Sequence, residues 1–151
     1  MGERAKLRIE SQTISMQELV DAAVAVAGKA YAPYSGFRVG AALLLTNGET
    51  VTGANVENVS YGLTICAERS ALVRAIAMFG PEIRIAAAAV INLNGAPSPP
   101  CGACRQVLAE FIDPDAPICF PAGSTGAVTA VTAVTLPFRE VLPFGFDLRL
   151  K

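Results

Sequence analysis

The sequence predicts an α/β fold, a three-layer α/β/α sandwich with a central mixed sheet of about five strands. Three observations support this prediction. Strand-like and helix-like patterns alternate along the chain, as in α/β domains. The apolar run 85–91 is continuous enough for a strand covered on both faces. The length of 151 residues is that of a single domain.

The N-terminal part of the chain divides into an arm and a first helix. Residues 1–14 are polar and without pattern, so we expect a loosely ordered arm, followed by one domain over residues 15–151. Residues 15–31 are predicted to form a helix. Ser15 and Glu18 have the spacing of a capping box. One apolar stripe follows at helical spacing, made of Leu19, Val20, Ala23, Ala27 and Ala30.

The middle of the chain predicts a hairpin and a second helix. Two β-rich runs within residues 37–57 flank Asn47-Gly48, a strong hairpin signal. Residues 64–80 have helical periodicity, with Thr64 as the expected N-cap and Gly80-Pro81 as the end. The apolar positions of that helix are Ile65, Leu72, Ile76 and Phe79.

The remaining elements follow in the same alternation. Residues 83–93 are predicted to be a strand, although alanine is a poor strand former. Residues 100–112 predict a third helix with Pro100 near its first turn. Two short strands are expected at 116–123 and 127–136, and a final helical turn at 137–143.

Composition excludes several classes of partner. The formal net charge is −1, which gives no electrostatic basis for binding nucleic acid or an acidic membrane surface. The 52% hydrophobic content is high, but the longest apolar run is far below the ~18 residues of a membrane-spanning helix. We therefore expect a homo-oligomer. Without a visible secretory signal, a reducing cytoplasm is expected, where disulfides are rare.

The cysteines indicate a metal site. Cys101 and Cys104 stand three positions apart at a helix start, so their sulfurs can share a ligand. Zinc requires four ligands, and the chain has no histidine. The third ligand is then Cys66, Cys119 or a carboxylate. Cys66 heads another predicted helix, and the two helix N-termini would favour thiolates.

Three cysteine ligands would leave the fourth position open for water, which is typical of a catalytic zinc site. Glu68, two residues after Cys66, is then placed to take and return protons in a hydrolytic reaction. Three other interpretations remain open at this point. The pair can be a thioredoxin-like redox motif, Cys119 can complete a structural zinc site, and Glu68 can be an ordinary solvated acid. Cys119 otherwise fits a small buried side chain.

The motifs resemble a known family. "CAE" followed by "PCGAC" is similar to the zinc nucleobase deaminase pattern. Four segments resemble the small homotetrameric cytidine deaminases in order, with the similarity running from Ser15 to Leu148: "YAPYSGFRVGAALL", "GANVENVSYGLTICAERSAL", "SPPCGACRQVL" and "LPFGFDL". The resemblance implies a cytidine deaminase-like fold and zinc-dependent conversion of cytidine and 2′-deoxycytidine to uridine and 2′-deoxyuridine, with ammonia released, in pyrimidine salvage. It also implies a cytoplasmic homotetramer with one zinc ion per subunit and shared active sites.

The resemblance also implies roles for single residues. Cys66, Cys101 and Cys104 would hold zinc, and Glu68 would carry a proton from water to ring N3 and later to the departing amine. The substrate-binding positions would be Phe37 against the pyrimidine, Asn55 and Glu57 on the ribose, Tyr61 and Phe146 from neighbouring subunits, and also Ala67. Arg69 would hydrogen-bond the ligand sulfurs, with support from Gln106.

One residue departs from the family pattern. Pro99 stands where the family usually has serine, so the backbone carbonyl is kept but Pro99-Pro100 stiffens the loop. Two alternatives to a cytidine deaminase remain. One is a related deaminase for a modified cytosine nucleoside, such as a blasticidin-type antibiotic. The other is a non-catalytic oligomer stabilised by zinc.

Overall fold

Five strands form the mixed sheet at the centre of the computed structural model, which describes residues 6–7, 14–123 and 132–147. The strand order is β4-β3-β5-β6-β7, and only β5 and β6 are parallel. The strands are β3 (Val39–Leu45), β4 (Thr50–Ala54), β5 (Ile85–Asn92), β6 (Pro117–Ala122) and β7 (Thr132–Pro137). The helices are α1 (Met16–Ala27), α2 (Ala67–Phe79), α3 (Gly102–Ala109) and α4 (Phe138–Val141), with a 3₁₀ turn η1 (Tyr61–Leu63).

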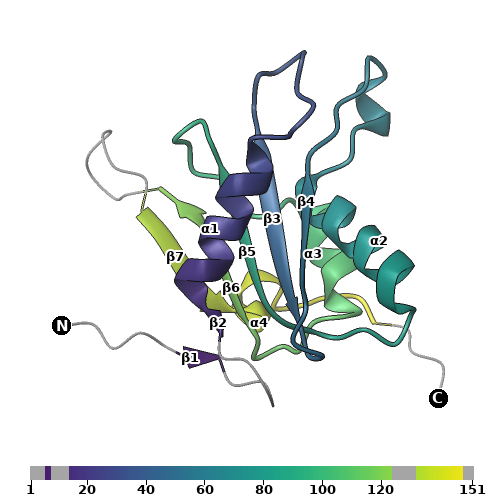
Figure 1. Cartoon of the computed structure of the whole chain (residues 1–151), viewed down its shortest axis with the longest axis vertical. Coiled ribbons are helices and arrows are strands. Elements are labelled where there is room, and N and C mark those ends of the chain that lie inside the picture. Colours follow the sequence, from purple (N-terminus) through teal and green to yellow (C-terminus); the bar gives the residue numbers. More distant parts are fainter. Residues whose placement is uncertain (1–5, 8–13, 124–131, 148–151) are drawn as a thin grey trace.

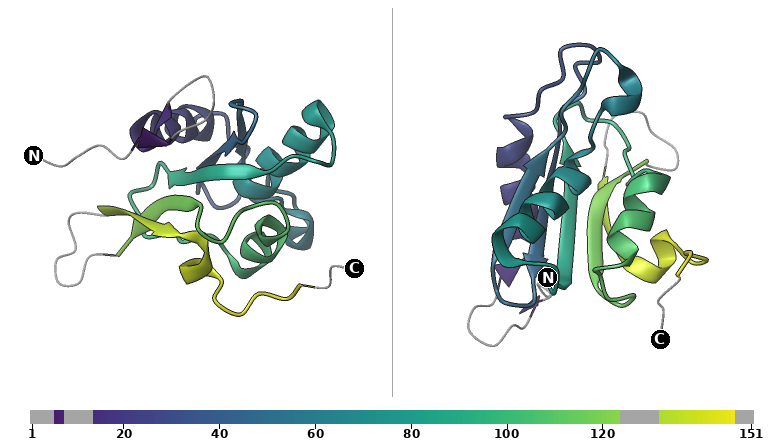
Figure 2. Two further views of the ribbon diagram at one scale, coloured as in Figure 1. Left: turned by 90° about the horizontal axis from the view of Figure 1, so that it is seen from below. Right: turned by 90° about the vertical axis from the view of Figure 1, so that its right-hand side faces the viewer.

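Helices cover both faces of the sheet, which confirms the predicted three-layer architecture (Figures 1 and 2). Strand β3 shows why. Its side chains alternate, with Ala41 and Leu43 in the core under α2 and α3 and Ala42 and Leu44 in the core under α1. A strand buried on both faces reads as a continuous apolar run, which also holds for β5. In the described part of the chain, no helix has the length and apolar character needed to span a bilayer.

Helix α1 begins as the sequence predicts and ends earlier. The Ser15 side chain accepts from the Glu18 backbone, and the Glu18 carboxylate accepts from Ser15 N at 2.7 Å, so the capping box is present. The helix stops at Ala27, before the predicted Tyr31, because Tyr31 forms a bridge to Val56. Lys6–Leu7 (β1) pair antiparallel with Ile14–Ser15 (β2). The rest of the expected N-terminal arm lies outside the described residues.

The predicted start of the second helix is wrong. Thr64 caps the end of η1, and Cys66 is the N-cap of α2. The reason is a tertiary contact, because Ile65 and Val56 exchange two backbone hydrogen bonds of 2.9 Å and hold the chain extended there. Cys66 keeps this extended geometry, with ψ of 155°. Its side chain therefore lies at the N-terminus of α2 and not along the side of the helix.

Helices α1 and α2 each approach the sheet closely at a glycine, α1 at Gly40 and α2 at Gly53. A Cβ on Gly40 would meet Ala23 O of α1 at 2.0 Å, and one on Gly53 would meet Ala71 N of α2 at 2.3 Å. Small side chains on the helices make this approach possible. The alanines of β5 fit the same pattern, since Ala87 and Ala89 face α1.

The predicted hairpin and the later elements are confirmed. Gly48 has φ of +91° in the turn between β3 and β4, a conformation in which glycine is the default residue. The strand predicted at 127–136 is present from Thr132 onward, and its earlier residues lie outside the described part of the chain. Helix α3 covers a shorter range than predicted, ending at Ala109.

Candidate active site and metal centre

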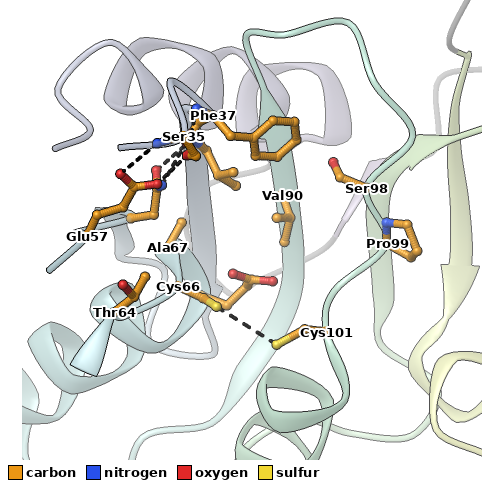
Figure 3. Close-up of a pocket in the computed structure, with 13 residues that line it drawn as sticks. Ser35, Phe37, Glu57, Thr64, Cys66, Ala67, Val90, Ser98, Pro99 and Cys101 are labelled. Carbon is orange, nitrogen blue, oxygen red and sulfur yellow. Dashed lines mark hydrogen bonds between the residues drawn. The ribbon is translucent and has the colours of Figure 1, made fainter. Parts of the chain in front are cut away.

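Three cysteine sulfurs meet where α2 and α3 begin. Cys66 is the N-cap of α2, Cys101 is the N-cap of α3, and Cys104 lies in the first turn of α3. The three Sγ atoms lie within 4.8 Å of one another, and those of Cys66 and Cys101 are 3.8 Å apart. Figure 3 shows Cys66 and Cys101 facing each other. The convergence of two helix N-termini, expected from the sequence, is therefore present.

The sulfur cluster fits a zinc ion. Two sulfurs bonded to one tetrahedral zinc at about 2.3 Å lie about 3.8 Å apart, which is the separation of Cys66 and Cys101. Cys119 is not a fourth ligand. It lies on β6 in the core under α1, on the other side of the sheet, with 4% of its surface exposed. The four-cysteine structural site is thus excluded, and the cluster has the three-ligand composition of catalytic zinc sites.

The surroundings of the sulfurs favour negative charge. Arg69 Nη2 lies 3.7 Å from Cys66 Sγ. A hydrogen bond from Cys104, together with the contact to Arg69, lowers the pKa of the Cys66 thiol to about 5. The same hydrogen bond and burial raise the pKa of the Cys104 thiol. The bond to Cys66 also raises the pKa of Arg69, which stays a cation.

Glu68 lies beside the sulfurs in the wall of a cavity of about 230 Å³. Only 4% of its surface is exposed, so it is not a solvated helix acid. Burial raises the pKa of its carboxyl group, and the nearby Cys66 thiolate acts in the same direction. The cavity is lined by eight residues singled out in the sequence: Phe37, Asn55, Glu57, Cys66, Ala67, Glu68, Pro99 and Cys101. The other lining residues are Ser35, Val39, Thr64, Val90 and Ser98.

Asn55 and Glu57 line the cavity and brace one of its walls. Asn55 Nδ2 donates to Phe37 O, and Asn55 Oδ1 accepts from Val39 N, both at 2.8 Å. The Glu57 carboxylate accepts from Tyr34 N at 2.9 Å and from the backbone and hydroxyl of Ser35. The Ser35 hydroxyl bond contributes most to a lowered pKa of Glu57. Each group keeps bonding capacity, because an amide has two N–H bonds and a carboxylate about four acceptor sites.

Three of the predicted residues lie away from this cavity in the described chain. Tyr61, on η1, is 73% exposed and packs edge-to-face on Tyr34 at 5.9 Å. Phe146 is also 73% exposed and lies in the C-terminal tail. The structure gives Gln106 a different partner from the one expected: its amide bonds to the Phe146 backbone, at 2.7 Å to O and 3.2 Å from N.

Sequence reasoning missed several residues that shape the site. Ser35 holds Glu57, and Arg105 donates to Pro100 O at 2.6 Å and to Val141 O at 3.1 Å. Arg105 thereby fixes the Pro99-Pro100 loop against the C-terminal part of the chain. Nothing in the local sequence marks these contacts, because each partner is distant along the chain or a backbone atom.

Cys119 provides a test of the ligand set. We expect Cys119→Ala to keep one zinc ion per chain, measured by elemental analysis, since its thiol faces the α1 core. Cys101→Ala is the matched control and should lose zinc. A Cys119→Ala protein without zinc would restore the four-cysteine site.

Comparison with known proteins agrees with this geometry. Residues 13–119 match the family described as "Cytidine and deoxycytidylate deaminase zinc-binding region". The chain is 42% identical over 130 residues to a cytidine deaminase of Halalkalibacterium halodurans, covering 86% of this chain and 92% of that protein.

Solved structures give the same result. The crystal structure of a cytidine deaminase from Burkholderia pseudomallei matches with a TM-score of 0.73 and 39% identity, over 88% of this chain and 100% of the other. That from Mycobacterium tuberculosis matches with a TM-score of 0.72 and 36% identity, over 89% and 99%. With the family match spanning more than two thirds of its 151 residues, the chain belongs to the zinc-binding cytidine and deoxycytidylate deaminase family.

Proposed function

We propose that the protein deaminates cytidine and 2′-deoxycytidine by hydrolysis, giving uridine or 2′-deoxyuridine and ammonia. The observation that carries this proposal is Glu68, a buried carboxyl group beside three cysteine sulfurs, in a cavity that also holds Phe37, Asn55 and Glu57. The relatives named above are cytidine deaminases. A nucleoside is therefore the substrate class.

Each side chain has a defined task in this reaction. Cys66, Cys101 and Cys104 would hold a zinc ion, which would supply a Lewis acid that lowers the pKa of water to near neutrality. Glu68 would take one proton from the attacking water and pass it to N3 of the pyrimidine ring. It would then take the second proton from the same oxygen, once that oxygen is bonded to C4, and pass it to the departing amino group. Its buried position keeps these protons away from bulk solvent.

The chain's own charges match this chemistry. Three thiolates on one Zn²⁺ carry a net charge of −1, which weakens the metal as a Lewis acid. The Arg69 guanidinium, 3.7 Å from the Cys66 sulfur, offsets part of that charge. Pro99 offers only a carbonyl as a hydrogen-bonding group, which suits an amino group as its partner.

Asn55 and Glu57 bind the ribose of the substrate. Both polar groups line the cavity, and each would lose a partner if free cytosine were bound without its sugar. A site built for a hydroxyl group discriminates strongly against a ligand without one. We therefore expect cytidine and 2′-deoxycytidine to be substrates and cytosine to be a very poor one.

An absorbance assay tests the proposed function directly. The purified, zinc-loaded protein is incubated with cytidine, 2′-deoxycytidine, cytosine and a blasticidin-type nucleoside, and ammonia is measured in parallel. Turnover of both plain nucleosides supports the proposal. Turnover of the antibiotic alone would assign the related activity, and zinc without any turnover would indicate a structural oligomer.

The protein is also proposed to act as a cytoplasmic homotetramer in which neighbouring subunits complete each cavity. Three ligand thiols must stay reduced, which a cytoplasm provides. Two aromatic rings support shared cavities, because Tyr61 and Phe146 match family positions at the cavity yet lie outside its lining within the described chain. Phe144, two residues before Phe146, is 97% exposed in the same tail.

Mixed oligomers test the shared cavity. Aromatic stacking on a base is worth about 1–3 kcal/mol, so Phe146→Ala should raise KM by about five- to 150-fold. Phe146→Ala and Glu68→Ala chains are then dissociated, mixed and reassembled. We expect activity at low cytidine above that of either variant, since some cavities then combine an intact Glu68 with an intact Phe146 from a neighbour.

Phe144 provides the matched control for Phe146. Phe144→Ala, which changes a neighbouring exposed ring, should alter KM far less than Phe146→Ala. The composition of the mixed oligomers is verified by native mass spectrometry. If verified hybrids are no more active than Phe146→Ala alone, each subunit uses its own tail and the shared cavity is wrong.

A further inference from the structure

Phe37 precedes strand β3, which lies between β4 and β5 in the sheet. Pairing between β3 and β5 reaches Val39 and Asn92, and Leu93 N then donates to Arg38 O at 3.0 Å. At Gly36, where φ is +69°, the chain turns away. Phe37 therefore belongs to a short segment just before the N-terminal end of β3, and its ring lies over the cavity (Figure 3).

Asn94 continues the pairing of this segment on the β5 side. Its Oδ1 accepts from Arg38 N at 3.0 Å, and its Nδ2 donates to Gly36 O at 3.1 Å. A side-chain amide offers the same acceptor and donor as a peptide group. Asn94 thus takes the place of the next residue in the ladder and holds the peptide groups on both sides of Phe37.

Asn55 does the same from the β4 side. It bonds Phe37 O and Val39 N, which alternate with the groups that Asn94 bonds. Two asparagines from opposite neighbours therefore hold successive peptide groups, as neighbouring strands would. Asn55 faces the cavity and belongs to the substrate site, whereas Asn94 is exposed and does not line the cavity.

Asn94 is itself held in place by a buried residue. Asn92 Oδ1 accepts from Asn94 N at 2.9 Å, and Asn92 Nδ2 donates to Ser98 Oγ and to Ala96 O, both at 2.7 Å. Asn92 is 8% exposed. The loop that bears Asn94 is therefore ordered before any ligand binds, which is what a positioning role requires.

We propose that Asn94 is a positioning residue that sets the Phe37 ring against the pyrimidine and thereby determines nucleoside affinity. It acts only through the Gly36 and Arg38 peptide groups. This proposal rests on the proposed function, since it concerns the same cavity. Asn94 touches neither the cysteines nor Glu68 through these bonds, so it affects binding and leaves the chemical step unchanged.

Kinetics of a double-mutant cycle test the proposal. Asn94→Ala removes both bonds and should raise KM for cytidine about three- to tenfold, with kcat within about twofold. Asn94→Asp keeps the acceptor for Arg38 N and loses the donor to Gly36 O, so its KM should be intermediate. In a Phe37→Ala background, Asn94→Ala should have no further effect on KM. Effects that multiply would overturn the proposal.

A matched control and a second measurement keep the test independent of activity. Asn47→Ala removes an equivalent bond, from Glu49 N at 3.0 Å, in the distant hairpin and should leave KM unchanged. Amide exchange at Arg38 should rise about tenfold or more in Asn94→Ala, and an unchanged rate would refute the positioning role. If the wild-type protein does not deaminate cytidine, the proposed function fails, while the exchange measurement still decides whether Asn94 orders the segment.

Discussion

Replacing Glu68 with glutamine is expected to lower kcat by about 10²- to 10⁴-fold, the range of general acid–base catalysis. Glutamine keeps the size of the buried side chain but neither accepts nor returns a proton at neutral pH. Because the three sulfurs are untouched, zinc content should remain at the wild-type value. The measurement is turnover of cytidine under saturating conditions, together with zinc per chain.

An acid elsewhere on the surface provides the matched control for Glu68. Glu82→Gln changes an exposed carboxylate just after α2 and should leave kcat unchanged. A fully metallated Glu68→Gln protein with wild-type kcat would remove Glu68 from the mechanism. Loss of zinc along with activity would instead show that Glu68 supports the metal site.

Gly53→Ala is expected to destabilise the fold and to disturb the active site as well. The new Cβ would lie 2.3 Å from Ala71 N and 2.7 Å from Ala67 O, both backbone atoms of α2. Backbone cannot rotate away as a flexible side chain can, so α2 must move. Overpacking costs about 1–3 kcal/mol, occasionally more, which corresponds to a fall in Tm of about 2–12 °C at this chain length.

The displacement of α2 also predicts a second effect. Cys66 and Glu68 stand at the start of that helix, so kcat should fall together with Tm. Gly62→Ala is the control for thermal stability, because a Cβ there has no atom within 4 Å. An unchanged Tm for Gly53→Ala would mean that the sheet and α2 separate without cost, contrary to the close packing described above.

The core of the site was predictable from sequence because its residues sit at helix starts. Cys101 and Cys104 share a face by local spacing alone, and Cys66 and Glu68 lie within one turn of each other. Their assembly needed only the expectation that two helix N-termini meet. The layers of the fold were predictable for a similar reason, since the apolar runs of β3 and β5 report burial on both faces.

What the sequence could not predict depends on contacts between distant segments. The start of α2 is set by the pairing of Ile65 with Val56, which overrides the capping preference of Thr64. Gln106 contacts a tail residue 40 positions away, and Asn94 contacts Gly36, 58 positions away. An exposed asparagine between a strand and a proline-rich loop has the ordinary composition of a turn, so its partner becomes visible only in three dimensions.

The arrangement of the ligands at two helix caps links metal supply to unfolding. Cys66 makes no side-chain capping bond of its own to α2, and 35 positions separate it from Cys101. A zinc ion shared by these sulfurs would bind the folded chain, in which they lie together, and not the unfolded chain, in which this loop is open. By mass action, each tenfold rise in free zinc above its Kd adds about 1.4 kcal/mol to the free energy of unfolding. The fraction of chains that are folded at equilibrium would therefore depend in part on the zinc concentration around them.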